Sequence, residues 1–303
     1  MIKPRPTMDG VCHMQIRKKG DTMIDLHTHT CKSDGSLTPT ELLDHAKEVG
    51  LDAIAITDHD TVDGIEEAMA YAKTIGIRFI PGIEISAERE GHDIHIVGLF
   101  IDHTNSEFKE TLQGFMESRD RRNEKMCAML REGEGMDISV PQLMEMFPDC
   151  VLTRAHYARY MLEKGYIKSV YEAFERFIGD GKPYFITREK VECKKAIELI
   201  LMAGGVPILA HPYLYHLSDR RIEELIVELK GYGLAGIEAH YTTHSAAETR
   251  QVIEWAKKYG LLVSGGSDFH GAAKPKTFLG KGFGDLYVDD SVLEKIAAYH
   301  ATK

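Results

Sequence analysis

The sequence predicts an α/β fold in which a mainly parallel sheet curls into a closed or distorted barrel. Apolar runs alternate with helical segments, a pattern that is typical of βαβ units. About seven of the runs end in polar motifs, as barrel strands do at the face that carries an active site. An open doubly wound sheet is the alternative, and it is disfavoured because no glycine-rich phosphate loop follows the first strand.

The first half of the chain supplies four expected strands, each an apolar run next to a polar motif. They cover residues 23–27, 53–57, 79–84 and 94–99. The helix after the first strand has a clear start, because Thr38 and Glu41 match a capping box and Pro39 occupies the first helical position. Gly50 ends this helix, and a second helix is expected over residues 64–75.

The pattern changes between residues 102 and 190, where the sequence is mostly helical and lacks strand-like apolar runs. We expect an inserted, mainly helical subdomain there, and a barrel domain formed by residues 23–101 and 191–303. Residues 1–22 contain basic residues without an apolar core, so we interpret them as a loosely ordered N-terminal extension and not as a signal peptide. The later expected strands lie at residues 206–210, 234–238 and 261–265, with helices near 193–203, 221–231 and 245–259.

Composition restricts the partners that this protein can have. The net charge of −10 disfavours binding to long nucleic acid or to an anionic membrane surface. A small anionic substrate remains compatible, because bound metal ions can reverse the field inside one pocket. No apolar run approaches the roughly 18 residues that span a bilayer. The five cysteines are scattered and form no C-x-x-C pair, so a reducing, cytoplasmic compartment is expected; the sequence does not indicate an oligomeric state.

The chain contains 15 histidines, and many of them fall at the ends of expected strands. His27 and His29 are two residues apart in a strand, so both imidazoles point to the same face. Asp34 follows in a turn that can fold its carboxylate back over them. The other candidates at the same end of the expected barrel are His59, Glu84, His95, His211, Asp268 and His270.

Each of these residues alone could be an ordinary polar residue at a strand end. Together they form a set of nitrogen and oxygen ligands without thiolate, which suits Mn²⁺, Zn²⁺ or Fe²⁺. This number of ligands exceeds what one ion needs. We therefore expect two or three divalent ions, with Mn²⁺ favoured. Two ions bridged by a carboxylate can activate water and stabilise a leaving oxygen.

Two further residues are weaker candidates. Asp60 follows His59 and could orient that ring, or it could cap the next helix. His240 faces the expected pocket by strand alternation and could protonate a leaving oxygen, or it could support a ligand. Glu238 is interpreted as structural, and Asp93 is expected in the loop before the fourth strand.

These motifs resemble those of the polymerase and histidinol phosphatase (PHP) superfamily of metal-dependent phosphoesterases. The resemblance covers about residues 23–100 and 193–290. It rests on Asp25-Leu26-His27-Thr28-His29, Ser33-Asp34-Gly35, Thr57-Asp58-His59-Asp60, Gly82-Ile83-Glu84-Ile85-Ser86, His95, Ala210-His211-Pro212 and Ser267-Asp268-Phe269-His270.

The resemblance implies a distorted (β/α)7 barrel and three metal sites. The first would be held by His27, His29, Glu84 and Asp268. The second would share Glu84 as a bridge and add His95 and His211. The third would take Asp34, His59 and His270. A metal-bridging hydroxide would then be the nucleophile.

The position of the insertion resembles the small stand-alone branch of this superfamily. That branch implies hydrolysis of the 3′-phosphate of nucleoside 3′,5′-bisphosphates to give the nucleoside 5′-monophosphate. Thr153-Arg154-Ala155-His156 resembles the branch's phosphate-contact segment, with Arg154 and His156 as the contacts. In a helix the two side chains would not lie side by side, so this interpretation requires a helix N-terminus that faces the pocket. The alternative is a surface arginine at the start of an amphipathic helix.

Other functions remain open on sequence grounds. The enzyme alternatives are a 5′→3′ exonuclease on short oligonucleotides, a histidinol-phosphate phosphatase and a metal-dependent amidohydrolase. A non-catalytic PHP module that serves as an interaction surface belongs to a different class. The complete ligand set disfavours this last alternative, because such modules are expected to have lost ligands.

Overall fold

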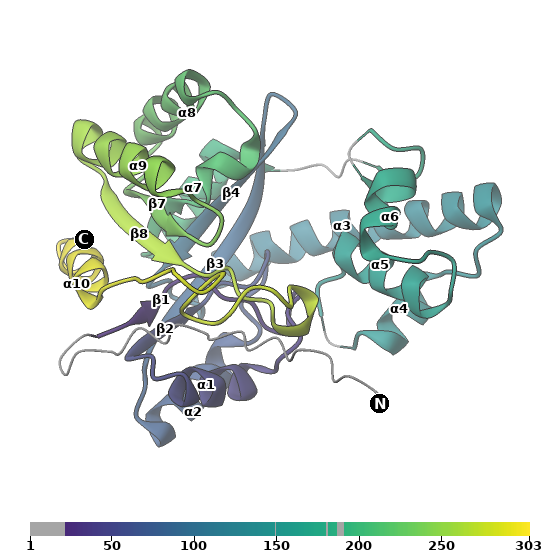
Figure 1. Ribbon diagram of the computed structural model, residues 1–303, viewed down its shortest axis with the longest axis horizontal. Helices are drawn as coiled ribbons and strands as arrows, with labels where there is room; N and C mark the ends of the chain where they lie inside the picture. Colours follow the sequence, from purple (N-terminus) through teal and green to yellow (C-terminus); the bar gives the residue numbers. More distant parts are fainter. Residues whose placement is uncertain (1–21, 149, 180, 187–190) are drawn as a thin grey trace, which may run out of the picture.

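The computed structural model describes residues 22–148, 150–179, 181–186 and 191–303, so the expected N-terminal extension lies almost wholly outside the described residues (Figure 1). The described strands form a nearly closed α/β barrel in the order β1-β2-β3-β4-β6-β7-β8, which confirms the predicted fold class. They are β1 (Ile24–Asp25), β2 (Ala53–Ile56), β3 (Arg78–Arg89), β4 (His92–Leu99), β6 (Val206–Leu209), β7 (Gly236–Tyr241) and β8 (Leu262–Gly266), while β5 (Val191–Glu192) pairs with β3 outside this path.

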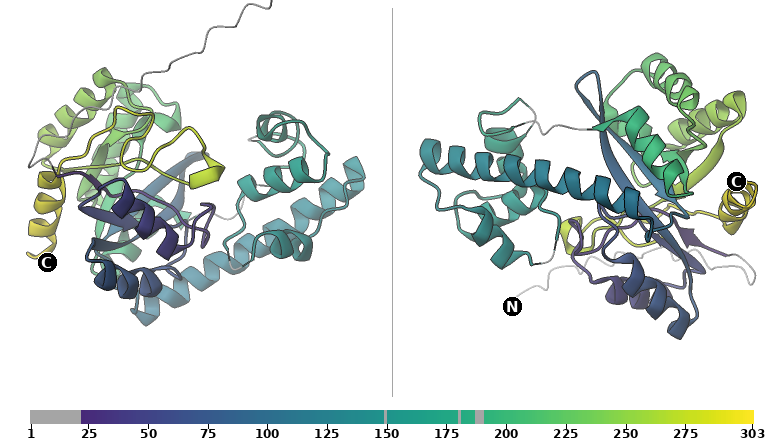
Figure 2. Two further views of the ribbon diagram at one scale, coloured as in Figure 1. Left: turned by 60° about the horizontal axis from the view of Figure 1, so that its bottom comes forward. Right: turned by 180° about the vertical axis from the view of Figure 1, so that it is seen from behind.

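Helices flank the strands on the outside of the barrel (Figures 1 and 2). They are α1 (Pro39–Glu48), α2 (Ile65–Ile75), α7 (Cys193–Met202), α8 (Asp219–Gly231), α9 (Ala246–Tyr259) and α10 (Asp290–His300). The predicted capping box starts α1: the Glu41 amide donates to the Thr38 hydroxyl at 3.2 Å, and the Thr38 amide donates to the Glu41 carboxylate at 2.8 Å. Among the described residues, no helix combines the length and apolarity needed to cross a bilayer.

The residues of β2 show how the core is divided. Ile54 and Ile56 pack into a cluster with residues of α1 and α2, whereas Ala53 and Ala55 join an inner cluster that also receives α10. Successive residues alternate between the two faces of a strand, so a continuously apolar run is needed when both faces are covered. The barrel interior is therefore packed with side chains at this end, and polar groups gather at the other.

Within the predicted mainly parallel sheet, β4 is the exception, because it runs antiparallel to both β3 and β6. Only Glu90 and Gly91 separate β3 from β4, and both have positive φ, of 52° and 79°. Two such residues form a tight hairpin turn and leave no room for a crossover helix. As a result Asp93, expected in a loop, lies within β4, and His95 reaches the site from the first half of its strand.

The barrel closes between β1 and β8 with few contacts. The Leu26 amide donates to the Gly265 carbonyl at 3.2 Å, and beyond the strand ends the Asp268 amide donates to the His27 carbonyl at 2.8 Å. Gly266 permits this approach, because a Cβ there would lie 2.4 Å from the His27 Cβ and 2.5 Å from the His27 amide nitrogen. The same closure brings the motifs that follow the two strands together.

We therefore expect Gly266→Ala to lower the free energy of unfolding by about 2 kcal/mol or more, because the added methyl group forces the two strands apart. Gly114→Ala in the helix that follows β4 is the matched control, since nothing lies within 4 Å of a Cβ built there. That control should be neutral or slightly stabilising. Chemical denaturation followed by circular dichroism measures both, and equal stability of the two variants would contradict the close approach.

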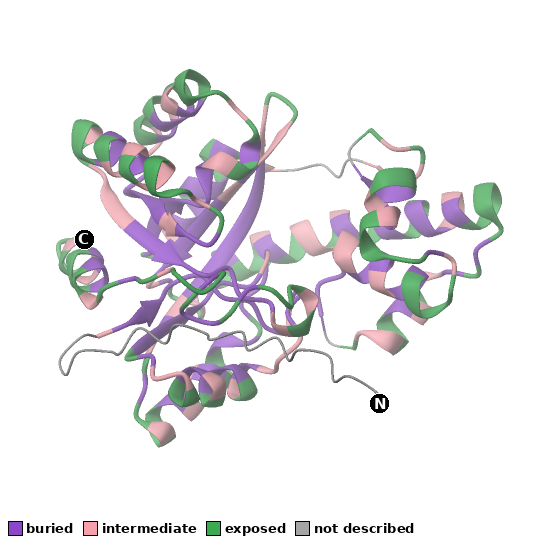
Figure 3. Ribbon diagram, in the orientation of Figure 1, coloured by how far each residue is buried: buried purple, intermediate pink, exposed green. Residues whose placement is uncertain are grey.

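The chain between β4 and β5 forms a group of helices that stands to one side of the barrel (Figures 1 and 2). These elements are α3 (Ser106–Glu134), α4 (Val140–Met146), α5 (Arg154–Glu163), α6 (Val170–Ala173) and the π-helix η1 (Phe174–Ile178). They enclose a hydrophobic cluster of their own around the buried residues Tyr157 and Tyr160. Buried and exposed stretches alternate along these helices (Figure 3). This separate core favours our proposed division into an insertion (102–190) and a barrel (23–101 and 191–303).

Helix α3 connects the barrel to the insertion. Phe108 and Leu112 near its start belong to the barrel core, and Met126 and Leu130 near its end belong to the insertion core. The intervening positions on the same side are occupied by buried polar residues, Arg119, Arg122 and Asn123. Buried charge in the middle of an otherwise apolar helix face indicates a polar cavity at this junction.

Candidate metal centre and adjoining cavity

The structure brings the nine predicted ligand side chains together at one end of the barrel. His27 and His29 follow β1, Asp34 lies in the turn after them, and His59 follows β2. The remaining members are Glu84 in β3, His95 in β4, His211 after β6, and Asp268 and His270 after β8. His211 and Asp268 have positive φ, of 24° and 55°, which is uncommon for residues other than glycine and clusters at functional sites.

Glu84 is the centre of this cluster, and its two carboxylate oxygens face different partners. Oε2 lies 3.3 Å from His27 Nε2, 3.2 Å from His29 Nε2 and 3.1 Å from His59 Nδ1. Oε1 lies 2.9 Å from His95 Nδ1 and 3.0 Å from His211 Nε2. One carboxylate between two groups of imidazoles is the arrangement that a bridge between two metal ions requires.

Two further carboxylates complete the cluster. Asp268 Oδ1 lies 3.2 Å from His29 Nε2, and Asp34 Oδ1 lies 3.2 Å from His270 Nε2. The four side chains His29, Asp34, His59 and His270 each offer a ligand atom within 4.8 Å of the others. His29 and His59 thus each belong to more than one group of potential ligands. The assignment of individual residues to three ions remains a prediction.

The chemistry of these donors fits divalent metal ions. In the described part of the chain His27 Nε2, His29 Nε2 and Asp34 Oδ1 are buried without a hydrogen-bond partner. Buried polar atoms without partners are costly, so their convergence indicates a site for a cation. The donors are imidazole nitrogens and carboxylate oxygens without thiolate, a set that Mn²⁺, Fe²⁺ and Zn²⁺ accept.

The carboxylates of the cluster are held in the ionised form that binds metals. Burial raises the pKa of Glu84, but the imidazoles of His27, His59 and His95 outweigh it and keep that pKa well below its usual value. Burial likewise raises the pKa of Asp34, and His270 and His59 outweigh it. Burial lowers the pKa of His59 to about 3, so this ring is neutral and has a lone pair available at neutral pH.

Glu238, interpreted from sequence as structural, holds two of the candidate ligands in place. Its carboxylate lies 3.1 Å from His27 Nδ1 and accepts a hydrogen bond of 2.8 Å from the His211 amide. A histidine whose Nδ1 is engaged in this way directs the lone pair of Nε2 toward a metal. Glu238 is therefore a positioning residue behind the centre.

We expect Glu238→Gln to weaken metal binding by about 10- to 100-fold, because the amide supports the His27 ring less strongly than a carboxylate does. Metal titration by calorimetry measures this change directly. Glu254→Gln, an exposed position on α9, is the control and should bind metal as the parent does. Unchanged affinity in both variants would show that His27 does not need this partner.

His240 belongs to none of the candidate ligand groups among the described residues. The β7–β8 pairing shifts register between Glu238 and His240, so the simple alternation on which its predicted orientation rested is interrupted. Burial lowers its pKa, which disfavours the protonated form that a general acid needs. Its catalytic role remains a prediction.

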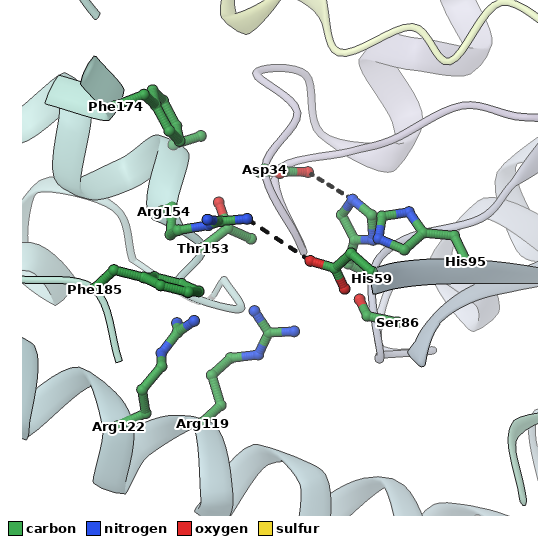
Figure 4. A pocket seen from close by; sticks show the side chains of 12 residues that line it. Asp34, His59, Ser86, His95, Arg119, Arg122, Thr153, Arg154, Phe174 and Phe185 are labelled. Carbon is green, nitrogen blue, oxygen red and sulfur yellow. Dashed lines mark ion pairs between the residues drawn. The ribbon is translucent and has the colours of Figure 1, made fainter. Parts of the chain in front are cut away.

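A cavity of about 220 Å³ adjoins the centre, between the barrel and the insertion (Figure 4). Asp34, His59 and His95 line it on the barrel side. Arg119 and Arg122 from α3, together with Thr153, Arg154, Ala155, Phe174 and Phe185, line it on the insertion side. The side chains of Arg119, Arg122 and Arg154 extend from the insertion into this space, so the cavity suits an anionic group (Figure 4).

The N-terminus of α5 faces this cavity, as the predicted phosphate contact of Arg154 requires. The Arg154 guanidinium stacks over the Phe185 ring at 4.7 Å and lies 3.7 Å from the Asp93 carboxylate. His156 points elsewhere: its Nδ1 accepts from the Thr153 amide at 3.0 Å, and its side chain is buried. Burial lowers the pKa of His156 to about 4, so this ring is neutral. A phosphate contact by His156 stays a prediction, and this geometry does not favour it.

Arg119 and Arg122 were not identified from the sequence. They are three residues apart in a strongly charged helix, a pattern that equally fits a solvated surface. Arg119 pairs with Asp60, whose carboxylate also accepts from the Ser86 amide at 2.9 Å. Asp60, expected to support His59, thus connects the barrel to an arginine of the insertion.

Comparisons with known proteins show the family to which this chain belongs. The family described as the PHP domain matches residues 25–229. A 5′-3′ exoribonuclease from Haemophilus influenzae is 38% identical over 249 residues, which cover 81% of this chain and 89% of the relative. A 3′,5′-nucleoside bisphosphate phosphatase from Chromobacterium violaceum is 35% identical over 248 residues, which cover 82% and 87%. A solved structure from Bifidobacterium adolescentis, assigned as a metal-dependent phosphoesterase, superposes with a TM-score of 0.81 at 28% identity and covers 91% of this chain and 96% of its own.

Proposed function

Because the chain belongs to the PHP domain family and is a metal-dependent phosphoesterase, we propose that it hydrolyses the 3′-phosphoester of a nucleotide carrying a 5′-phosphate. The favoured substrate is a nucleoside 3′,5′-bisphosphate, as the name of the Chromobacterium violaceum relative suggests. The observation that carries this proposal is the cavity of Figure 4, which places Arg119, Arg122 and Arg154 beside the metal centre. Bidentate arginines suit a phosphate that binds without reacting.

The proposed metal ligands are the nine clustered side chains. His27, His29, Glu84 and Asp268 would hold one ion, and Glu84, His95 and His211 a second. Asp34, His59 and His270 would hold a third, and Mn²⁺ is the favoured metal. Such ions polarise phosphoryl oxygens and lower the pKa of bound water.

The protein's own residues would place the substrate for this chemistry. The arginines of the insertion bind the 5′-phosphate, which sets the 3′-phosphate against the cluster around Glu84. Water adds to phosphorus, the bond from phosphorus to the 3′ oxygen breaks, and that oxygen leaves with a proton. The products are a nucleoside 5′-monophosphate and inorganic phosphate. The remote contact contributes binding energy that orients the reacting group.

A 5′→3′ exonuclease acting on short oligonucleotides is the second candidate. It uses the same bond cleavage, and the Haemophilus influenzae relative carries such a name. A cavity lined by Tyr241 and Phe283 on the far side of Asp268 favours it. Histidinol phosphate is disfavoured because it has no second phosphate for the three arginines. We propose the reducing cytoplasm as the compartment, since the described cysteines are free thiols.

Phosphate release and product analysis with added Mn²⁺ test this proposal. The substrates are adenosine 3′,5′-bisphosphate, a 5′-phosphorylated dinucleotide and histidinol phosphate at equal concentration. We expect preference for the bisphosphate with AMP as product. Faster cleavage of the dinucleotide would favour the exonuclease, and preference for histidinol phosphate would overturn the role of the arginine cavity.

A further inference from the structure

A second cavity, of about 440 Å³, lies against the metal centre and shares no lining residue with the arginine cavity. Asp268 separates this cavity from the cluster. Its Oδ1 lies 3.2 Å from His29 Nε2, whereas its Oδ2 accepts hydrogen bonds of 2.7 Å from the Tyr241 hydroxyl and of 2.7 Å from Lys274 Nζ. Tyr241 and Lys274 both line the cavity, so only the Asp268 carboxylate stands between this cavity and a group bound at the metal centre.

The walls of this second cavity are suited to a ligand that combines a flat apolar ring with a nearby anionic group. Leu214, Tyr241 and Phe283 supply apolar surface, and Lys274 and Lys276 supply cations. The Phe283 side chain is 56% exposed although it is aromatic. Phe283 belongs to the segment between β8 and α10. Part of this segment extends toward the insertion (Figure 1). Exposed aromatic surface beside basic groups is typical of sites that stack nucleic-acid bases.

We propose that this cavity binds the second nucleoside of a 5′-phosphorylated oligonucleotide, with its base stacked on Phe283. This inference rests on the proposed function, which places the 5′-phosphate among the arginines and the reacting phosphorus at the metal centre. A chain that continues past the reacting phosphate must leave by another route, and the second cavity begins at a different ligand, Asp268.

The reaction on such a substrate is balanced by one water molecule. Water adds to the phosphorus that joins the first two nucleosides, and the bond to the 3′ oxygen of the first nucleoside breaks. The 3′ oxygen leaves with a proton as part of a nucleoside 5′-monophosphate. The rest of the chain keeps the phosphate as its new 5′ end and can be bound again.

Phe283→Ala tests the inference, because a nucleoside 3′,5′-bisphosphate has no second base to stack. We expect the variant to lose about ten-fold more kcat/KM on a 5′-phosphorylated diadenosine nucleotide than on adenosine 3′,5′-bisphosphate. The loss should disappear on a dinucleotide whose second residue is abasic. Phe278→Ala is the matched control: Phe278 belongs to the same segment and is also 56% exposed, but it does not line the cavity.

A binding measurement supplies a readout besides turnover. A dinucleotide with 2-aminopurine as its second base and a slowly cleaved phosphorothioate link should lose fluorescence on binding to the parent protein. The loss should be smaller with Phe283→Ala and unchanged with Phe278→Ala. Three outcomes would overturn the second-nucleoside site. The first is an equal loss of activity on both substrates in Phe283→Ala, and the second is no fluorescence quenching by the parent protein. The third is a parent protein that cleaves the bisphosphate but never the dinucleotide. Inactivity on both substrates while the labelled dinucleotide still binds would instead overturn the proposed function.

Discussion

Replacement of Glu84 by glutamine is expected to lower kcat by at least about a hundred-fold while the barrel stays folded. Glu84 is the side chain whose two oxygens face separate groups of imidazoles, at 2.9–3.3 Å. A neutral amide of the same size removes the charge that would hold two divalent ions together. We therefore expect metal content, measured by mass spectrometry after dialysis, to fall together with phosphate release.

Glu88→Gln is the matched control for this experiment. Glu88 lies four residues further along β3, is partly exposed and lines neither cavity. It should keep the metal content and the activity of the parent protein. Full activity in Glu84→Gln would remove the bridging role of Glu84, and equal losses in both variants would indicate damage to β3 and not to the centre.

The sequence was sufficient to predict the barrel and the convergence of the nine candidate ligands. The reason is geometric: strands of a barrel present their motifs at a common end, so residues such as His27, Glu84 and Asp268 meet even though they are far apart in the chain. The strict period of two along a strand also fixes which side chains face inward. These rules need no knowledge of packing between distant elements.

The features that the sequence did not predict depend on contacts that have no local signature. The hairpin between β3 and β4 rests on a two-residue turn at Glu90 and Gly91, inside a sequence otherwise consistent with parallel strands. A register shift in the pairing of β7 with β8 lies between Glu238 and His240, so the inward–outward alternation of side chains cannot be extended from Glu238 to His240. The role of Arg119 follows only from the packing of α3 on the barrel, since an arginine on a charged helix is usually solvated.

Replacement of Arg154 by alanine should raise KM for adenosine 3′,5′-bisphosphate by about 10- to 100-fold more than KM for adenosine 3′-monophosphate. A hydrogen bond to a charged group contributes about 1.5–3 kcal/mol, and only the bisphosphate offers a 5′-phosphate to this side chain. The guanidinium is already oriented over Phe185, so its loss removes a preformed contact. The preference for the bisphosphate over the monophosphate is the quantity to measure.

Arg159→Ala on the same helix is the appropriate comparison, because Arg159 stacks over Phe147 at 4.9 Å and does not line the arginine cavity. It should leave the ratio of the two KM values unchanged.

If Arg154→Ala raised both KM values equally, the arginine cavity would not be the site of the remote phosphate. If it raised neither, Arg119 and Arg122 would be sufficient for that contact, and the double variant Arg119→Ala/Arg122→Ala should then abolish the preference. Arg119 also pairs with Asp60, and Arg154 with Asp93, so both the double variant and Arg154→Ala need a stability measurement beside their kinetics.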